Sequence, residues 1–277
     1  GNGPFGNPVL PRVPGNGVGG TIVATGPGVD QALLGKRVVA TTGGVGGYAE
    51  RALANVDDVV SLPKGVEIKA AVALIADGRT ALMLFKQAEI KPGERVLVEA
   101  AAGGVGSLLV QLALNSGAVV IGAAGSAKKE PLVRSFGATF VDYSLPDWSE
   151  SARAALRQHG TSELDVVFDG IGGQIGTEAS KLLRRGGRIS LYGIASGSDT
   201  DLSHTHSIQV MGLSTAPRAS ETFSYIQQAL ELAANGKIRP VVGQIYPLED
   251  AALAHAAIEA RTTVGKTLLT AQRLSVS

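Results

Sequence analysis

The chain has 277 residues, of which 44% are hydrophobic and 18% charged, and its formal net charge is +1. Its size fits one large or two ordinary folded domains, and its composition excludes a disordered chain. The near-neutral charge excludes the electrostatic footprint of a nucleic-acid-binding protein. No apolar run approaches the roughly 20 residues that a membrane helix needs, and the first residues lack the pattern of a signal peptide. We therefore expect a cytoplasmic protein that binds neither nucleic acid nor membranes.

Up to about residue 65 the chain consists of short strand-like pieces separated by Gly and Pro. These pieces are GTIVATG (20–26), KRVVATTG (36–43), YAERALA (48–54) and DDVVSLP (57–63). So few strands would be marginal as a domain of their own. We therefore expect them to belong to a β-rich unit whose remainder lies elsewhere in the chain or outside it.

From about residue 66 helical and strand-like segments alternate. Apolar stripes at helical spacing predict helices at 67–76, 78–88, 107–117, 131–137, 147–159 and 174–185. Short apolar runs predict strands at 94–100, 118–124, 138–143, 163–170 and 188–193. Strands and helices in this order and spacing predict a parallel, doubly wound α/β sheet.

The C-terminal part returns to a mixed character. Its pattern predicts a helix at 219–235, extended segments at 238–248, a helix at 249–261 and a strand at 264–271. A β-rich beginning and a mixed end around an α/β centre indicate two domains. We expect one domain at 67–237 and a second domain built from residues 1–66 and 238–277.

Three glycine-rich stretches compete as a phosphate-binding loop. Such a loop needs a strand before it and a helix after it, so that the free N–H groups and the dipole of the helix face the phosphates. Residues 15–20 are the only literal G-x-G-x-x-G, but they follow PRVP and precede a strand-like segment, which indicates a turn. Residues 43–47 follow the strand-like RVVATT and precede the short YAERALA, which indicates a hairpin connection.

The third stretch, Gly103-Gly104-Val105-Gly106, meets the requirement. VLVEAAA precedes it as a strand, and the amphipathic SLLVQLALNSG follows it as a helix. Ala101 takes the place of the first glycine of the pattern, Gly103 lets the backbone approach a pyrophosphate, and Gly106 lets helix and strand pack closely. We therefore predict that this loop binds a dinucleotide.

The region about 20 residues beyond this loop distinguishes NAD from NADP. An NAD site has an Asp or Glu there, which binds the ribose hydroxyls. Here GSAKK (125–129) offers the hydroxyl of Ser126 and the ammonium groups of Lys128 and Lys129. Pro131 fits the first turn of the next helix, so both lysines lie at the helix start. The pattern favours NADP with its 2′-phosphate over two ordinary surface lysines.

Metal chemistry has little support in this sequence. Cysteine is absent, which excludes disulfides, thiolate metal ligands and cysteine nucleophiles. His204 and His206 form a candidate pair of metal ligands, but no partner segment supplies the third and fourth ligands of a typical site. We interpret them as part of a polar loop and expect no metal site.

Five motifs, in order along the chain, resemble those of one known family. They are AAAGGVGSLLVQLA, FDGIGG (168–173), GGRISLYGIASG (186–197), YPLEDAALAHAAIEA (246–260) and VGKTLL (264–269). They are similar to the medium-chain dehydrogenase/reductase superfamily, and within it to the zinc-free, NADPH-dependent quinone oxidoreductases of the zeta-crystallin-like group. The resemblance implies a Rossmann domain at 67–237 and a GroES-like catalytic domain. Residues 7–29 match the middle of that second domain, so we expect its N-terminal part to be absent from the sequence.

The resemblance also implies which residues contact NADPH. The implied set is Gly103, Gly104, Val105 and Gly106 at the pyrophosphate; Ser126, Lys128 and Lys129 at the 2′-phosphate; Tyr143 near the adenosine; Gly170, Ile171 and Gly172 beside the adenine or ribose; Gly193, Ile194 and Ala195 on the nicotinamide side; Thr80 near the nicotinamide ribose; and Lys266 near the nicotinamide end.

The implied activity is NADPH-dependent transfer of hydride to a quinone or an α,β-unsaturated carbonyl. The zinc site of related alcohol dehydrogenases needs cysteine ligands, which this chain lacks. Tyr48 is a candidate proton donor, with a core or rim tyrosine as the alternative. An enoyl reductase of polyketide or fatty-acid type and a nucleotide-binding protein with little turnover are the alternative functions. The resemblance also implies a homodimer formed through QVMGLS (209–214), at the edge of the sheet.

Overall fold

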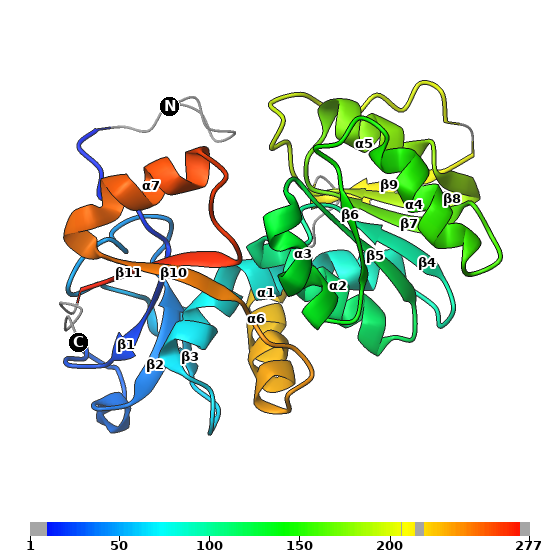
Figure 1. Cartoon of the computed structure of the whole chain (residues 1–277). Helices are drawn as coiled ribbons and strands as arrows, with labels where there is room; N and C mark the ends of the chain where they lie inside the picture. Colours follow the sequence, from blue (N-terminus) through cyan, green and yellow to red (C-terminus); the bar gives the residue numbers. More distant parts are fainter. Residues whose placement is uncertain (1–9, 206, 214–218, 272–277) are drawn as a thin grey trace.

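The larger of two lobes is built on a six-stranded parallel sheet (Figure 1). The computed structural model describes residues 10–205, 207–213 and 219–271. From edge to edge the strands are β6 (Thr139–Asp142), β5 (Val119–Ala124), β4 (Arg95–Val98), β7 (Leu164–Asp169), β8 (Leu183–Leu191) and β9 (Gln209–Gly212), and neighbouring strands are parallel throughout. The strand order reverses between β4 and β7. In doubly wound sheets, ligands bind outside the carboxyl ends of the strands at this switch point.

Helices cover both faces of the sheet and bury two apolar layers. One layer contains α1 (Ile68–Ala88), α2 (Gly104–Asn115), α3 (Glu130–Ser135) and α6 (Ala219–Ala234), and the other contains α4 (Trp148–Arg157) and α5 (Gly173–Ser180). Val96 and Val98 of β4 belong to the first layer, whereas Leu97 belongs to the second, as alternation along a strand requires. The predicted doubly wound α/β fold is confirmed.

A smaller β-rich part is formed by both ends of the described chain. The strands β1 (Gly17–Thr21), β2 (Arg37–Thr41) and β3 (Val59–Ser61) form an antiparallel sheet, and β10 (Val242–Pro247) and β11 (Lys266–Thr270) form a parallel pair beside α7 (Ala251–Glu259). Short 3₁₀ helices lie at Gln31–Leu33, Val56–Asp58, Ala127–Lys129 and Leu248–Asp250. Figure 1 shows the blue N-terminal strands close to the orange and red C-terminal elements. A separate β-rich unit built from both ends is therefore present, while its boundaries at 66 and 238 stay a prediction.

The two helices predicted at 67–76 and 78–88 are one continuous helix, α1, of 21 residues. The expected break falls at Asp77, and Gly78, the next residue, has a packing role within the helix. A Cβ at Gly78 would lie 2.9 Å from the Cβ of Ala229 in α6, so the glycine lets the two helices approach closely. Neither α1 nor another helix within the described residues is long and apolar enough to cross a membrane.

The strand prediction for YAERALA is wrong, because the connection that contains residues 43–47 leads to β3 instead. The strands β2 and β3 are antiparallel neighbours, but residues 42–58 connect them by an irregular path. Gly46 and Gly47 donate their N–H groups to the carbonyls of Val13 and Gly15, at 2.8 and 3.1 Å. This part of the connection therefore satisfies its N–H groups on residues 13–15 rather than on a neighbouring strand.

Two other predicted boundaries also differ. The strand expected at 20–26 is β1 at Gly17–Thr21, because residues 17–21 pair with β2. The helix expected to reach residue 185 ends at Ser180, and β8 begins at Leu183 because Leu183 pairs with Leu164 of β7.

Candidate functional site

The glycine loop at 103–106 follows β4 and runs into the first turn of α2, at the switch point of the sheet. Gly103 is the N-cap residue of α2, which begins at Gly104. A Cβ at Gly106 would lie 2.2 Å from the carbonyl oxygen of Ala100, so the close packing of helix and strand end requires glycine. The first turn of α2 carries no acidic residue, so its N–H groups and dipole suit an anion. The predicted strand, loop and helix are confirmed.

The two other glycine stretches lie together in the β-rich part. Residues 17–20 belong to β1, and the N–H of Gly44 donates to Asn16 Oδ1 at 2.7 Å. Neither stretch leads into an α-helix, as expected. The first stretch is largely a strand rather than the expected turn, because it pairs with β2.

Asp77 links three elements at the glycine loop, and sequence alone did not single it out. Its Oδ1 accepts a hydrogen bond from Lys266 Nζ at 2.9 Å, which forms an ion pair between α1 and β11. A Cβ at Gly104 would lie 1.9 Å from Asp77 Oδ2. The carboxylate therefore fills the space beside the start of α2.

The last strand is docked directly on the glycine loop. Gly265 donates its N–H to the carbonyl of Ala102 at 2.7 Å and pairs with Gly103 in an isolated parallel bridge. Lys266 follows Gly265, so the same contact carries its side chain to Asp77. Thr80 lies three residues after Asp77 on α1 and is therefore on the same side of that helix.

Lys129 and Arg261 form a positively charged corner after β5. The Ser126 hydroxyl accepts the N–H of Lys128 at 3.3 Å, and Lys129 is partly buried whereas Lys128 is exposed. Lys129 Nζ donates to the carbonyl oxygen of Arg261 at 3.4 Å. Burial, and next the Arg261 guanidinium, lowers the pKa of Lys129. Arg261 Nη2 donates to the carbonyl oxygen of Ala195 at 2.5 Å.

Arg261 is a site residue that the sequence reasoning missed. It lies in ARTTVGK between α7 and Gly265, in the left-handed region with φ 56°. Within the part of the chain that the structure describes, neither Arg261 nor Lys129 is ion-paired with a carboxylate. Two neighbouring cations repel each other, so an anion between them would lower the energy of both.

Tyr143 lies just after β6 and packs against the loop that carries these lysines. A Cβ at Gly125 would lie 2.7 Å from Tyr143 Cε2. Burial is the largest cause that raises the pKa of Tyr143, to about 12, although Arg261 partly opposes the rise. Tyr143 therefore presents a neutral ring beside the charged corner.

The loops after β7 and β8 are tied to each other. Ser196 donates its N–H to the carbonyl of Ile171 at 2.8 Å. A Cβ at Gly193 would lie 2.5 Å from the carbonyl oxygen of Gly170, and Gly172 has a φ of 71°. These glycines are thus required by the packing and turning of the two loops themselves.

A buried pair of carboxyl groups, Glu99 and Asp169, lies at the base of the loops after β4 and β7, and the sequence reasoning missed it too. Both residues are 0% exposed. They follow Val98 and Phe168, which are partners in the pairing of β4 with β7, so the two acids are neighbours at the strand ends. Burial, and next the charge of Asp169, raises the pKa of Glu99 well above its usual range. The sequence does contain a signal for this pair, because Glu99 is a charged residue in the middle of the otherwise apolar VLVEAAA.

The sites of the predicted cofactor residues share one edge of the sheet. They lie after β4 (Gly103, Gly104, Val105, Gly106), after β5 (Ser126, Lys128, Lys129), after β6 (Tyr143), after β7 (Gly170, Ile171, Gly172) and after β8 (Gly193, Ile194, Ala195), with Thr80 on α1 and Lys266 at the start of β11. Carboxyl ends of parallel strands meet at one edge, which brings residues together that are far apart in sequence.

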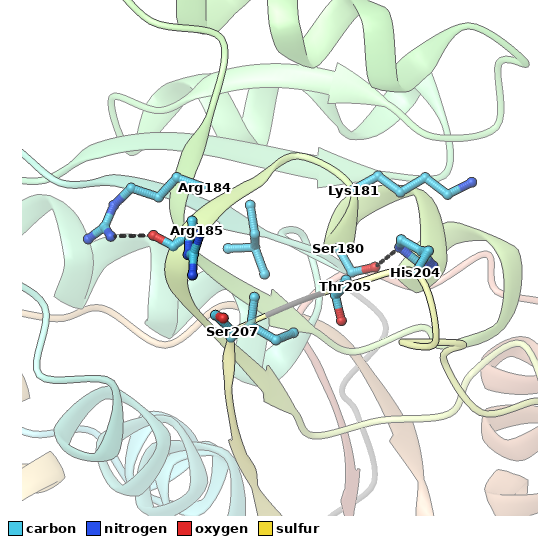
Figure 2. A pocket seen from close by; sticks show the side chains of 9 residues that line it. Ser180, Lys181, Arg184, Arg185, His204, Thr205 and Ser207 are labelled. Atoms are coloured by element: carbon cyan, nitrogen blue, oxygen red, sulfur yellow. Dashed lines mark hydrogen bonds between the residues drawn. The ribbon is translucent and has the colours of Figure 1, made fainter.

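A hollow of about 480 Å³ lies at the opposite end of β8 (Figure 2). Its polar lining comes from the end of α5, the start of β8 and the loop before β9, and consists of Ser180, Lys181, Arg184, Arg185, His204, Thr205 and Ser207. In Figure 2 His204 points to Ser180, with His204 Nε2 3.1 Å from Ser180 Oγ. His206 lies outside the described residues. Among those described, no three acidic, His or Cys side chains gather as a metal site would require, and the expected absence of a metal stays a prediction.

Tyr48, the candidate proton donor, contacts α7 in the β-rich part. Its hydroxyl lies 3.1 Å from His255 Nε2, and the two ring centroids are 5.9 Å apart. A Cβ at Gly15 would lie 2.6 Å from Tyr48 Cδ1, so the ring also packs on the neighbouring strand entry. These contacts favour the alternative of a rim tyrosine.

Comparison with known proteins identifies the family. A family described as zinc-binding dehydrogenase matches residues 136–269. A quinone oxidoreductase from Sus scrofa is 32% identical over 268 residues, which cover 95% of this chain and 80% of that protein. A 2-haloacrylate reductase from Burkholderia sp is 29% identical over 276 residues, covering 95% of this chain and 82% of that protein. The crystal structure of Escherichia coli quinone oxidoreductase complexed with NADPH matches with a TM-score of 0.83 at 31% identity, covering 96% of this chain and 84% of that one.

These similarities extend over both the parallel sheet and the β-rich part. They agree with the five motifs and with the strand, loop and helix at residues 95–115. The chain therefore belongs to the quinone oxidoreductase family of the medium-chain dehydrogenase/reductase superfamily.

Proposed function

We propose that the protein is an NADPH-dependent oxidoreductase that transfers hydride to a quinone or an α,β-unsaturated carbonyl. One observation carries the proposal. The glycine loop after β4 begins α2, and after the neighbouring strand β5 Lys129 meets Arg261, which comes from the segment between α7 and β11. Neither cation has a carboxylate partner within the described chain. The loop suits a diphosphate, and the two cations suit an additional phosphate on the adenosine ribose. The relatives support the same function, since they include quinone oxidoreductases and one of these was solved with NADPH.

The adenosine half of NADPH fits the first half of the sheet. The N–H groups of the first turn of α2 would hold the diphosphate. Gly103 would leave room for the diphosphate, because no side chain projects from it. A Cβ at this position would be near Ala100 alone, with the Ala100 carbonyl oxygen at 3.1 Å. Ser126, Lys129 and Arg261 would hold the 2′-phosphate, with Lys128 as a more exposed contributor. Their donor groups and charges are those that a phosphate requires.

The nicotinamide half would occupy the other side of the switch point. Residues 193–195 would line it, and residues 170–172 would lie beside the adenine or ribose. The mutual packing of these two loops gives them a defined shape. Tyr143 would flank the adenosine, whereas Thr80 and Lys266 would lie toward the nicotinamide ribose. The contacts of Lys266 with Asp77 and of Gly265 with the loop support this placement.

Bound NADPH supplies the hydride for this reaction. The chain's part is to bind, to orient and to exclude water from the reacting atoms. Because the sequence contains no cysteine, we propose that no thiolate-bound zinc polarises the substrate. Hydrogen bonds to the carbonyl oxygen would instead stabilise the enolate charge that develops there, and Lys266 is our candidate for the nearest cation.

We also propose a homodimer formed through β9. This strand lies at one end of the sheet order, and the exposed Val210 and Leu213 lie on it or next to it. An exposed edge strand with apolar side chains favours pairing with a second copy. Ser214, the last residue of QVMGLS, lies outside the described residues. The cytoplasmic location stays a prediction.

Turnover with two acceptors tests the function. The protein is mixed with NADPH and either 9,10-phenanthrenequinone or an enoyl thioester, and NADPH oxidation is followed by absorbance. We expect oxidation with the quinone, and faster oxidation of NADPH than of NADH. A strong preference for the thioester would favour an enoyl reductase. Binding of NADPH without oxidation by either acceptor would contradict an enzyme and favour a nucleotide-binding role.

A further inference from the structure

The proposed function makes no use of the buried Glu99–Asp169 pair, whose two members have opposite surroundings. Asp169 is well supplied with donors. Its Oδ1 accepts the N–H groups of Ile171 and Gly172 at 2.9 and 2.7 Å, and its Oδ2 accepts the hydroxyl of Thr200. Three donors suit the charged form of a carboxyl group, and a carboxylate has about four acceptor positions.

Glu99 lacks such donors. It is 0% exposed, and neither of its carboxyl oxygens has a hydrogen-bond partner among the residues that the structure describes. The N–H groups of Gly170 and Ile171 face it and partly oppose the effect of burial, but the N–H of Ile171 donates to Asp169. Burial and the charge of Asp169 keep the pKa of Glu99 far above that of an exposed glutamate. These surroundings favour the protonated, neutral form of Glu99. In that form its O–H group is a hydrogen-bond donor next to the acceptor Asp169.

Each carboxyl group belongs to a different loop of the cofactor edge. Glu99 is followed by Ala100, which has a left-handed φ of 49° and whose carbonyl accepts the N–H of Gly103 at 2.7 Å. The carbonyl of Glu99 itself accepts the Tyr192 hydroxyl at 2.8 Å. Asp169 holds the start of the 170–172 loop. A hydrogen bond between the two acids would therefore join the loops on both sides of the switch point.

We propose that Glu99 is protonated at neutral pH and donates a hydrogen bond to Asp169, and that this shared proton positions the glycine loop and the 170–172 loop for the cofactor. The second half of this inference rests on the proposed function. Glu99 is a positioning residue, because it acts through the loops above it.

The other titratable groups that face the pair carry no charge. They are Tyr143 and Tyr192, and burial raises the pKa of both above that of a free tyrosine. Asp142 and Arg261 act on Tyr143 and are not among the groups that shift the pKa of Glu99. The net charge at the base of the two loops therefore depends on whether the proton between Glu99 and Asp169 is present.

Infrared spectroscopy tests the shared proton in the absence of cofactor. At neutral pH the wild type is expected to show the C=O band of a buried carboxylic acid, and Glu99→Gln is expected to lack it. Asp169→Asn is expected to lose the band too, because the Asn amide can donate to Glu99 and stabilise its charged form. Glu231→Gln changes an exposed glutamate of α6 and is the matched control that keeps the band. A wild type without the band overturns the shared proton.

Titration with NADPH tests the positioning role. Glu99→Gln keeps a donor toward Asp169 and is expected to retain most of the affinity. Glu99→Leu, similar in size but without a donor, is expected to weaken binding by about fivefold or more without loss of folding stability. If Glu99→Leu does not fold, Glu99→Ala removes the same donor. A folded variant without the donor that binds NADPH as tightly as the wild type overturns the positioning role.

The two experiments separate this inference from the proposed function. NADPH binding without the carboxylic band would overturn the inference and leave the proposed function intact. A band without any NADPH binding would overturn the proposed function and the positioning role, and would establish the proton pair alone.

Discussion

Lys266 Nζ lies 2.9 Å from Asp77 Oδ1, and this ion pair joins the last strand of the β-rich part to the helix beside the glycine loop. Only 13% of the Asp77 side chain is exposed, and its other oxygen fills the space beside Gly104. This interaction therefore helps to dock β11, together with the Gly265 contact, and balances the charge next to the start of α2. A carboxylate without its cation at this place would repel a diphosphate.

Lys266→Ala is therefore expected to weaken NADPH binding by about tenfold and to lower the free energy of unfolding by about 1–3 kcal/mol, because it leaves a largely buried carboxylate unpaired. Asp77→Asn in the Lys266→Ala background removes that charge and is expected to restore part of both quantities. Fluorescence titration and urea unfolding measure them. Unchanged affinity in Lys266→Ala would show that the pair has no role at the cofactor edge.

Lys129→Ala and Arg261→Ala are each expected to raise the KM for NADPH by about 10- to 100-fold, since a charge-assisted hydrogen bond is worth about 1.5–3 kcal/mol. The KM for NADH is expected to change little, because NADH lacks the 2′-phosphate. Lys128→Ala is the matched control at an exposed neighbour, and we expect a smaller effect. Equal losses for both cofactors would contradict the assignment of the charged corner.

Gly106→Ala in the predicted cofactor loop and Gly20→Ala in the literal G-x-G-x-x-G stretch test whether the two stretches differ in their need for glycine. The new Cβ would lie 2.2 Å from a backbone oxygen that cannot move aside, so we expect a loss of about 1–3 kcal/mol in unfolding free energy together with weaker NADPH binding. Gly20→Ala is the control, because a Cβ there meets nothing within 4 Å, and it is expected to stay within about 0.5 kcal/mol of the wild type. Similar effects of the two substitutions would be evidence against the close packing at residue 106.

Glu99 predicts how stability depends on pH. Its pKa is raised in the folded state, so the folded protein keeps this proton while the unfolded chain loses it above about pH 4.3. The contribution of Glu99 to stability therefore falls as pH rises, by up to about 1.4 kcal/mol per pH unit, until the folded-state pKa is reached. Glu99→Gln lacks this term, so its stability relative to the wild type is expected to increase between about pH 5 and about pH 8.

Urea unfolding at both pH values measures this difference. Glu231→Gln is the control, and its stability relative to the wild type is expected to be the same at the two pH values. A Glu99→Gln variant with an equally constant difference would mean that Glu99 is already ionised at the lower pH.

The parallel sheet was predictable because its strands are buried on both faces and are bounded by glycines. ELDVVFDG, for example, is an apolar run that the structure shows as the fully buried β7. Local pattern failed where backbone groups find distant partners. YAERALA has strand-like residues, but it forms no strand, and residues 46–48 just at its start donate their N–H groups to the carbonyls of residues 13–15.

The cofactor loop was predictable for a similar reason, since its strand, glycines and helix are consecutive in sequence. The residues that complete the site come from other elements. Lys266 is 189 residues away from its partner Asp77, and nothing near Asp77 in sequence signals a charge that must be paired. Arg261 and Glu99 also acquire their roles through tertiary contacts, with Lys129 and Asp169 respectively.

A crystal structure of the protein with NADPH tests the central claim most directly. We predict a diphosphate over the first turn of α2 and a 2′-phosphate within hydrogen-bond distance of both Lys129 and Arg261. A cofactor whose diphosphate lies away from residues 103–106, or whose 2′-phosphate contacts neither cation, would contradict the account.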